Sequence, residues 1–181
     1  MIKATIELLG EYPATEITFR MVAERAGVSR PTVYKFFDDV PSLVAKCTVD
    51  FLEKSLEDAE DGLSMLDFEG DIDYLTELMR RFVKLIYDKH VFCEHAVFSP
   101  ASPQIVREAI PLIDERMSTR LVSKRLSSSG DIGKDYRNAL SAGVVWLLIV
   151  WLRSDFKGPN TPDNFADRLG QTLYQFSNVS E

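Results

Sequence analysis

The sequence contains few residues of the kinds that build covalent cross-links, metal sites or cofactor sites. Only two cysteines and two histidines occur among its 181 residues, which excludes a framework of several disulfides and a cysteine-rich zinc site. No phosphate-binding loop, dinucleotide fingerprint, G-x-S-x-G or H-E-x-x-H pattern is present. We therefore expect neither an enzyme nor a bound cofactor.

Segments that direct proteins into or across membranes are also missing. No basic region followed by an apolar core suggests a signal peptide. The most apolar stretch, residues 139–152, has 14 residues, fewer than the roughly 20 needed to cross a bilayer. These features predict a cytoplasmic protein in which this stretch is a buried helix.

The hydrophobic residues, 45% of the chain, recur at helical spacing, and no segment alternates as a strand would. The spacing predicts an all-α protein of about nine helices, among them 2–11, 19–26, 30–37, 41–60, 71–90, 132–155 and 163–178. Residues 102–126 are predicted as two helices or as one helix kinked at Pro111, with a turn at 127–130.

Two short helices are predicted on either side of a tight turn in residues 17–37. Thr18 is placed to cap the first helix, and Gly27 suits the left-handed conformation that ends it. Ser29 is placed to cap the second helix, in which Val33 and Phe37 face inward. Because the turn is tight, the second helix must cross the first, as in a helix-turn-helix.

The outward face of the second helix has the chemistry of a DNA-recognition helix. Opposite Val33 lie Pro31, Thr32, Tyr34 and Lys35, with Arg30 at the exposed N-terminal end. Hydroxyl groups and cations are the groups that base edges and phosphates require in the major groove. This face therefore predicts DNA binding.

The whole stretch resembles the DNA-binding domain of the TetR family, the tetracycline-repressor-like (TetR/AcrR) transcriptional regulators. The pattern T-x-R-x-x-A-x-x-A-G-V-S-x-x-T-x-Y-x-x-F is formed by Thr18, Arg20, Ala23, Ala26, Gly27, Val28, Ser29, Thr32, Tyr34 and Phe37. The resemblance implies a helix-turn-helix domain over residues 1–47 and a ligand-binding and dimerisation bundle over 48–181. It also implies a DNA interface made of Thr18, Arg20, Ser29, Arg30, Pro31, Thr32, Tyr34, Lys35 and Lys46.

By the same resemblance, the protein is expected to be a homodimeric repressor that a small apolar or amphipathic ligand releases from a near-palindromic operator. The family implies a pocket among the later helices, although aromatic and methionine side chains are more often plain core. The candidates to line such a pocket are Met79, Phe82, Tyr87, Phe92, Phe98, Met117 and Trp146.

The last two predicted helices are the expected dimer interface. Residues 139–152 are apolar on every side, so one subunit can cover only part of this surface. Small residues would allow close approach, and aromatic and aliphatic residues of the final helix would complete a four-helix bundle. The candidates are Ala139, Ala142, Gly143, Phe165, Leu169 and Phe176.

The charge distribution supports a competing hypothesis. Residues 1–47 carry six basic and six acidic side chains, and the remainder carries the whole net charge of −7. Val40 also occupies a position at which the family commonly has a phosphate-binding lysine, for which Lys46 is a possible substitute. A family member that has lost DNA binding and serves as a protein-interaction module is the alternative.

His90, Cys93, Glu94 and His95 lie within six residues and include every histidine of the chain. Their side chains are those that ligate zinc, but the spacing matches no standard zinc site. Capping and packing at a helix end explain them equally well, so we predict no metal site.

Overall fold

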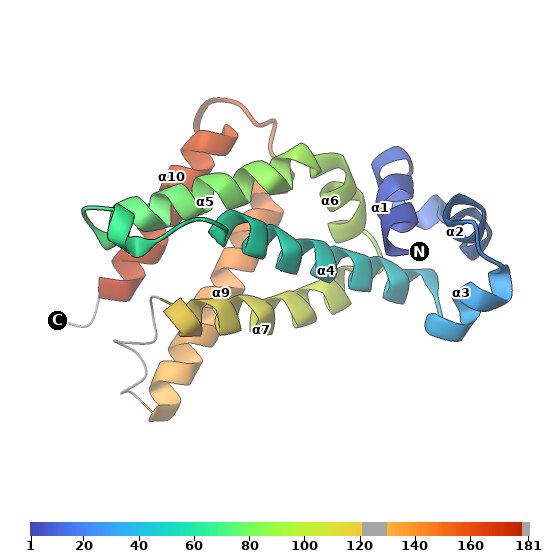
Figure 1. The fold of residues 1–181 in the computed structure, drawn as a ribbon, viewed down its shortest axis with the longest axis horizontal. Coiled ribbons are helices and arrows are strands. Elements are labelled where there is room, and N and C mark those ends of the chain that lie inside the picture. The colour runs from blue at the N-terminus through green and yellow to red at the C-terminus, as the bar shows by residue number, and fades with distance from the viewer. Residues whose placement is uncertain (121–129, 179–181) are drawn as a thin grey trace. The chain divides into compact units, whose positions relative to one another are not determined.

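The computed structural model describes residues 1–120 and 130–178. The helices are α1 (Ile2–Glu11), α2 (Phe19–Ala26), α3 (Arg30–Phe36), α4 (Val40–Glu60), α5 (Asp71–Asp88), α6 (His90–Val97), α7 (Ser102–Arg120), α9 (Gly130–Leu152) and α10 (Pro162–Asn178) (Figure 1). Short 3-10 helices are η1 (Ala14–Glu16), η2 (Met65–Asp67) and η3 (Gly158–Asn160). The predicted all-α class is confirmed, because these ranges contain no strand. None of their helices is both long and apolar enough to span a bilayer.

One compact unit consists of Met1–Glu53 and Lys89–Glu108. In it, α1 packs against α2 and α6. On α1, Leu8 and Leu9 are buried, and Ile2 and Ile6 are half-buried. Leu8 and Leu9 join a core to which every other helix of the unit contributes.

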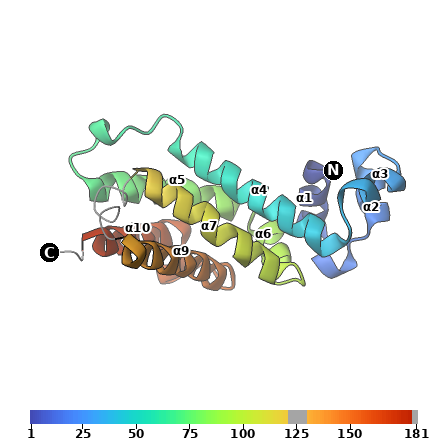
Figure 2. The ribbon, with the colours of Figure 1, turned by 90° about the horizontal axis from the view of Figure 1, so that it is seen from below.

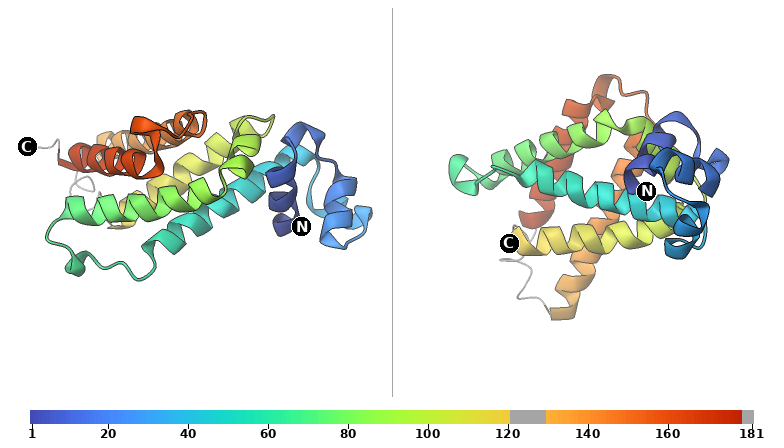
Figure 3. Two further views of the ribbon diagram at one scale, coloured as in Figure 1. Left: turned by 90° about the horizontal axis from the view of Figure 1, so that it is seen from above. Right: turned by 45° about the vertical axis from the view of Figure 1, so that its right-hand side comes forward.

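The second unit consists of Lys54–Asp88 and Ala109–Glu181. Within it α10 lies along α5, as the views of Figures 1 and 3 both show. A Cβ atom added at Gly170 would come within 3.0 Å of the Thr76 Cα, so glycine is what allows this close approach. The view from below shows α9 beside α10 (Figure 2).

An aromatic cluster joins the end of α9 to the start of α10. Trp151 is only 2% exposed, and its ring stacks on that of Phe165 with centroids 4.7 Å apart and planes 4° apart. Its indole Nε1 donates a hydrogen bond of 2.8 Å to the Asn160 carbonyl in η3. The Phe156 ring meets it edge-on at 5.1 Å. Such a filled and hydrogen-bonded site holds both helix ends in one geometry.

Two helices differ from the predictions. The predicted helix 71–90 ends at Asp88, because Lys89 leaves the helical conformation with φ −122° and ψ 25°, and the separate helix α6 follows. The open question at Pro111 resolves to one helix, since α7 continues through this residue. Residues 127–129 of the predicted turn lie outside the described residues.

Replacing Trp151 by alanine should remove the centre of the aromatic cluster and leave a cavity. We expect a loss of about 3–5 kcal/mol in the free energy of unfolding. Denaturant unfolding at one fixed protein concentration measures it. The control is Leu66→Ala, because Leu66 is 95% exposed and its loss should change stability by less than about 0.5 kcal/mol. Equal effects of the two substitutions would contradict the assignment.

Candidate functional site

The turn between α2 and α3 has the predicted capping chemistry. The Thr18 Oγ1 accepts a hydrogen bond of 3.3 Å from the Met21 amide and so caps α2. Gly27 ends the helix with φ +66° and ψ 30°. No atom lies within 4 Å of a Cβ added there, so the backbone angle and not the space requires glycine. The helix-turn-helix geometry predicted from sequence is confirmed at these residues.

Ser29 opens α3 through both its backbone and its side chain. The Ser29 Oγ accepts a hydrogen bond of 3.3 Å from the Thr32 amide, and it lies 2.8 Å from the Thr32 Oγ1. Pro31 occupies the first turn, where no amide donor is needed. The start of α3 is therefore fixed before any ligand is present.

The outer face of α3 consists of side chains that the chain itself does not cover. Val33 is fully buried, whereas Arg30, Pro31 and Lys35 are exposed and Thr32 is half-buried. Tyr34 is 62% exposed, yet its ring is braced edge-on against that of Phe19 at 4.9 Å. The Tyr34 ring is thus held in place at the surface.

Phe36, at the end of α3, was not among the predicted DNA-binding residues. It is 60% exposed, and the Lys35 Nζ lies 5.9 Å from the centre of its ring. The sequence contained a signal for this exposure, because Val33 and Phe37 already take the two inward positions of the helix.

Three cations of residues 1–47 are paired with acidic side chains. Arg25 makes two hydrogen bonds of 2.8 Å to the Glu11 carboxylate, which join α2 to α1 and hold the pKa of Glu11 below its usual value. Arg20 lies 3.8 Å from Glu24, and the Lys46 Nζ lies 2.6 Å from an Asp50 oxygen. Because these pairs are solvent-exposed they are weak, but a phosphate must compete with each of them.

Carboxylates mark the start of α4. The Asp39 Oδ1 accepts a hydrogen bond of 2.7 Å from the Ser42 amide, and the hydrogen bonds to Ser42 lower the pKa of Asp39. Asp38 is exposed beside it, and the half-buried Val40 begins the helix. The helix end is well capped but adds no cation to the surface.

The His and Cys cluster of α6 serves packing in the structure. The His95 Nδ1 lies 2.8 Å from the Leu9 carbonyl oxygen, and this contact links α6 to the last turn of α1. Cys93 is buried, and burial raises the pKa of its thiol to about 12. Burial raises the pKa of the Cys47 thiol likewise to about 12. Neither thiol is therefore a reactive group at neutral pH. The described residues contain no group of three or more side chains that could ligate a metal ion.

The seven predicted pocket residues do not share one environment. Met79 and Phe82 are buried on α5, and Tyr87 packs against Phe156 at 5.2 Å. Phe92 and Phe98 belong to the other compact unit, and the side chain of Met117 lies outside the described part of the chain. Trp146, at 63% exposure, does not belong to the packed interior of the chain.

The predicted interface residues divide into two groups. Phe165 and Leu169 are 4% and 1% exposed and pack inside the chain itself. Ala139 and Phe176 are exposed, and Ala142 and Gly143 are half-buried. Among the described side chains of α9 and α10, four large apolar ones are exposed, namely Trp146, Leu147, Val150 and Phe176.

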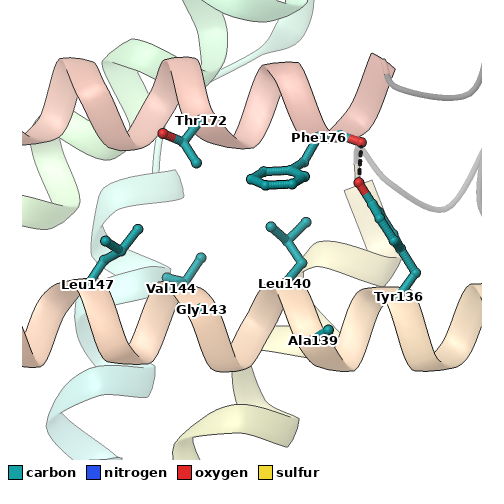
Figure 4. Close-up of a pocket in the computed structure, with 8 residues that line it drawn as sticks. All are labelled: Tyr136, Ala139, Leu140, Gly143, Val144, Leu147, Thr172 and Phe176. Carbon is teal, nitrogen blue, oxygen red and sulfur yellow. Dashed lines mark hydrogen bonds between the residues drawn. The ribbon is translucent and has the colours of Figure 1, made fainter.

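A groove of about 270 Å³ runs between the facing sides of α9 and α10 (Figure 4). It is lined by Tyr136, Ala139, Leu140, Gly143, Val144, Leu147, Thr172 and Phe176. At one end the Tyr136 hydroxyl donates a hydrogen bond of 2.8 Å to the Phe176 carbonyl. This apolar groove and the four exposed side chains lie on the same two helices.

Comparison with known proteins agrees with the helix-turn-helix geometry of α2 and α3. Residues 1–45 match the family of bacterial regulatory proteins called tetR. No curated protein matches the chain in sequence. The family and the structural relatives are transcriptional regulators, a class of proteins that are generally not enzymes.

Solved structures share the fold over nearly the whole chain. The TetR family repressor AlkX from Dietzia sp., implicated in biodegradation of n-alkanes, is 18% identical with a TM-score of 0.66, covering 97% of this chain and 92% of that one. A tetR-family transcriptional regulator from Streptomyces coelicolor is 14% identical with a TM-score of 0.65, covering 99% and 81%. The fatty acid degradation regulator FadR from Bacillus halodurans is 13% identical with a TM-score of 0.59, covering 99% and 97%. Residues 1–45 thus match the tetR family of bacterial regulatory proteins, and the chain as a whole has the fold of the solved TetR-family structures.

Proposed function

We propose that this protein is a homodimeric, ligand-controlled repressor whose residues 1–47 bind a near-palindromic operator and whose residues 48–181 dimerise and sense the ligand. The observation that carries the proposal is α3, a recognition helix capped by Ser29 and set by the Gly27 turn, with an outer face that the chain leaves exposed. Two such helices on a dimer would read inverted half-sites spaced by about 34–36 Å or a multiple of it.

The exposed apolar surface of α9 and α10 supports the dimer. Trp146, Leu147, Val150 and Phe176 are between 38% and 63% exposed, although large apolar side chains gathered on one surface favour burial. A twofold axis at these helices would set the same surface of two subunits together. The small residues Ala139, Ala142 and Gly143 would permit close approach of the two α9 helices.

The proposed effector is a small apolar or amphipathic molecule. Two structural relatives are a repressor implicated in n-alkane biodegradation and a regulator of fatty acid degradation. Coupling requires that the ligand bind with unequal affinity to two arrangements of the DNA-binding domains. Because α4 begins in one compact unit and ends in the other, we propose that it transmits this difference. A thermal-shift screen of alkanes, fatty acids and alcohols would identify a stabilising ligand.

A second candidate function is a protein-interaction module that no longer binds DNA. It is favoured by the balanced charge of residues 1–47, by the pairing of Lys46 with Asp50, and by Val40 at the start of α4. Such a module would show no salt-dependent affinity for any duplex.

Fluorescence anisotropy with DNA from upstream of the protein's own gene separates the two functions. A repressor should bind one fragment with an affinity that falls steeply as salt rises, because bound cations release counterions from the DNA. Absence of binding to every fragment of this region and to a random duplex pool at low salt would support the interaction module. A pocket ligand that leaves operator affinity unchanged would remove the sensing role.

Arg30→Ala tests base reading. If Arg30 contacts a base edge, the substitution should weaken operator binding by about 1–3 kcal/mol and relax the preference at one position in each half-site. Selection from a randomised operator pool measures both effects. Equal weakening on all sequences would reassign Arg30 to a phosphate contact.

Val40→Lys tests the start of α4. If this helix end faces the DNA backbone, each added lysine should tighten binding on every sequence and steepen the salt dependence by roughly 0.9 per contact. Leu66→Lys adds the same charge at an exposed position of the other unit and is the matched control. A slope and affinity identical to those of the unchanged protein would mean that this helix end does not face DNA.

Trp146→Asp tests the dimer surface. A charge at the centre of a buried apolar interface is costly, so the variant should sediment as a monomer at micromolar concentration, where the unchanged protein should sediment as a dimer. Leu66→Asp is the control for added charge on an exposed apolar residue. A monomeric unchanged protein would overturn the proposed assembly.

A further inference from the structure

An exposed phenyl group stands at the last position of the recognition helix. Phe36 is 60% exposed, and the core below α3 is filled by the fully buried Val33. Its neighbour Tyr34 is also exposed, at 62%, but the Tyr34 ring rests on Phe19. The Lys35 Nζ lies 5.9 Å from the centre of the Phe36 ring. The phenyl group therefore contributes little to the packing of the domain, and most of its apolar surface is accessible for contact with another molecule.

The charges around α3 make apolar contacts more important than in a basic DNA-binding domain. Residues 1–47 have no net charge, and Arg25 and Lys46 are held by carboxylates at 2.8 and 2.6 Å. Because the domain carries no net charge, the sequence-independent part of the affinity is small. A larger share must come from contacts with the base edges in the groove.

If α3 lies in a major groove, its length would bring its last turn to the wall of the groove. Its seven residues span about 10 Å, close to the roughly 12 Å width of the major groove. The one apolar group that a base pair displays there is the C5-methyl of thymine, which lies on the side of the pair nearest to its own backbone. A side chain at the end of a helix of this length can reach that edge.

We propose that Phe36 is a specificity-determining residue that selects a thymine in each half-site by packing its ring against the C5-methyl group. The contact excludes cytosine, which lacks the methyl group, without any hydrogen bond. This inference rests on the proposed DNA-binding function, since it requires α3 to lie in the major groove.

A double-mutant cycle between protein and DNA tests the contact. The operator is first selected from a random pool, and each thymine of one half-site is then replaced in turn by deoxyuridine, which removes only the methyl group. For the unchanged protein, one replacement should weaken binding by roughly fourfold, the effect of one buried methyl-sized group. In Phe36→Ala the same replacement should have no effect, whereas Phe36→Leu should keep part of it.

Two controls separate the contact from a change in folding. Leu66→Ala removes an exposed apolar side chain from the other unit and should leave every thymine effect unchanged. Thermal unfolding of Phe36→Ala should match that of the unchanged protein, because the ring is largely in water.

Three results would overturn the inference. If Phe36→Ala weakens binding but every deoxyuridine effect persists, the ring contacts sugar or supports the fold and reads no methyl group. If Phe36→Ala binds as the unchanged protein does, the ring is not in the interface. If the unchanged protein binds no duplex, the proposed function fails together with this inference, and the exposed aromatic surface is then assigned to a protein partner.

Discussion

The left-handed backbone of Gly27 is the constraint on which the DNA-binding geometry depends. At φ +66° it ends α2 abruptly and turns the chain within two residues to the Ser29 cap of α3. A side chain at this position would meet no atom within 4 Å, so the requirement is purely conformational. Because both helices are capped by their own hydroxyl side chains, the angle between them is set locally, and α3 presents one face to the core and the other to solvent.

The proposed recognition surface depends on the positions of the α3 side chains more than on the net charge of the domain. The cations of the domain are balanced by acidic residues, and several are paired at short distance. Tyr34, Phe36 and Pro31 give α3 an outer face with more apolar area than a phosphate-binding surface needs. Weak general attraction combined with shape-dependent contacts favours discrimination among sequences, because the sequence-independent term is small.

In the second compact unit, the apolar helix α9 has one buried side and one exposed side. On α9, Trp151 is buried at the centre of an aromatic cluster, while Trp146, five residues earlier, is 63% exposed. Five residues turn a helix by about 500°, which places the two rings on clearly different sides. The side bearing Trp151 packs inside the chain, and the side bearing Trp146 remains exposed.

Local chemistry in the sequence determined the caps, the Gly27 turn, the inward Val33 and the helical class, because each depends on residues within a few positions of one another. The break at Lys89 was not predicted from the sequence, which gave one helix over 71–90. The continuation of α7 through Pro111 chose between two outcomes that the sequence had left open. The same holds for the apolar residues: the sequence identified Phe165, Leu169, Trp146 and Phe176 as hydrophobic, but hydrophobicity has no direction. Only the folded chain, in which α10 packs along α5 and Phe165 stacks on Trp151, decided which of them are interior and which remain exposed.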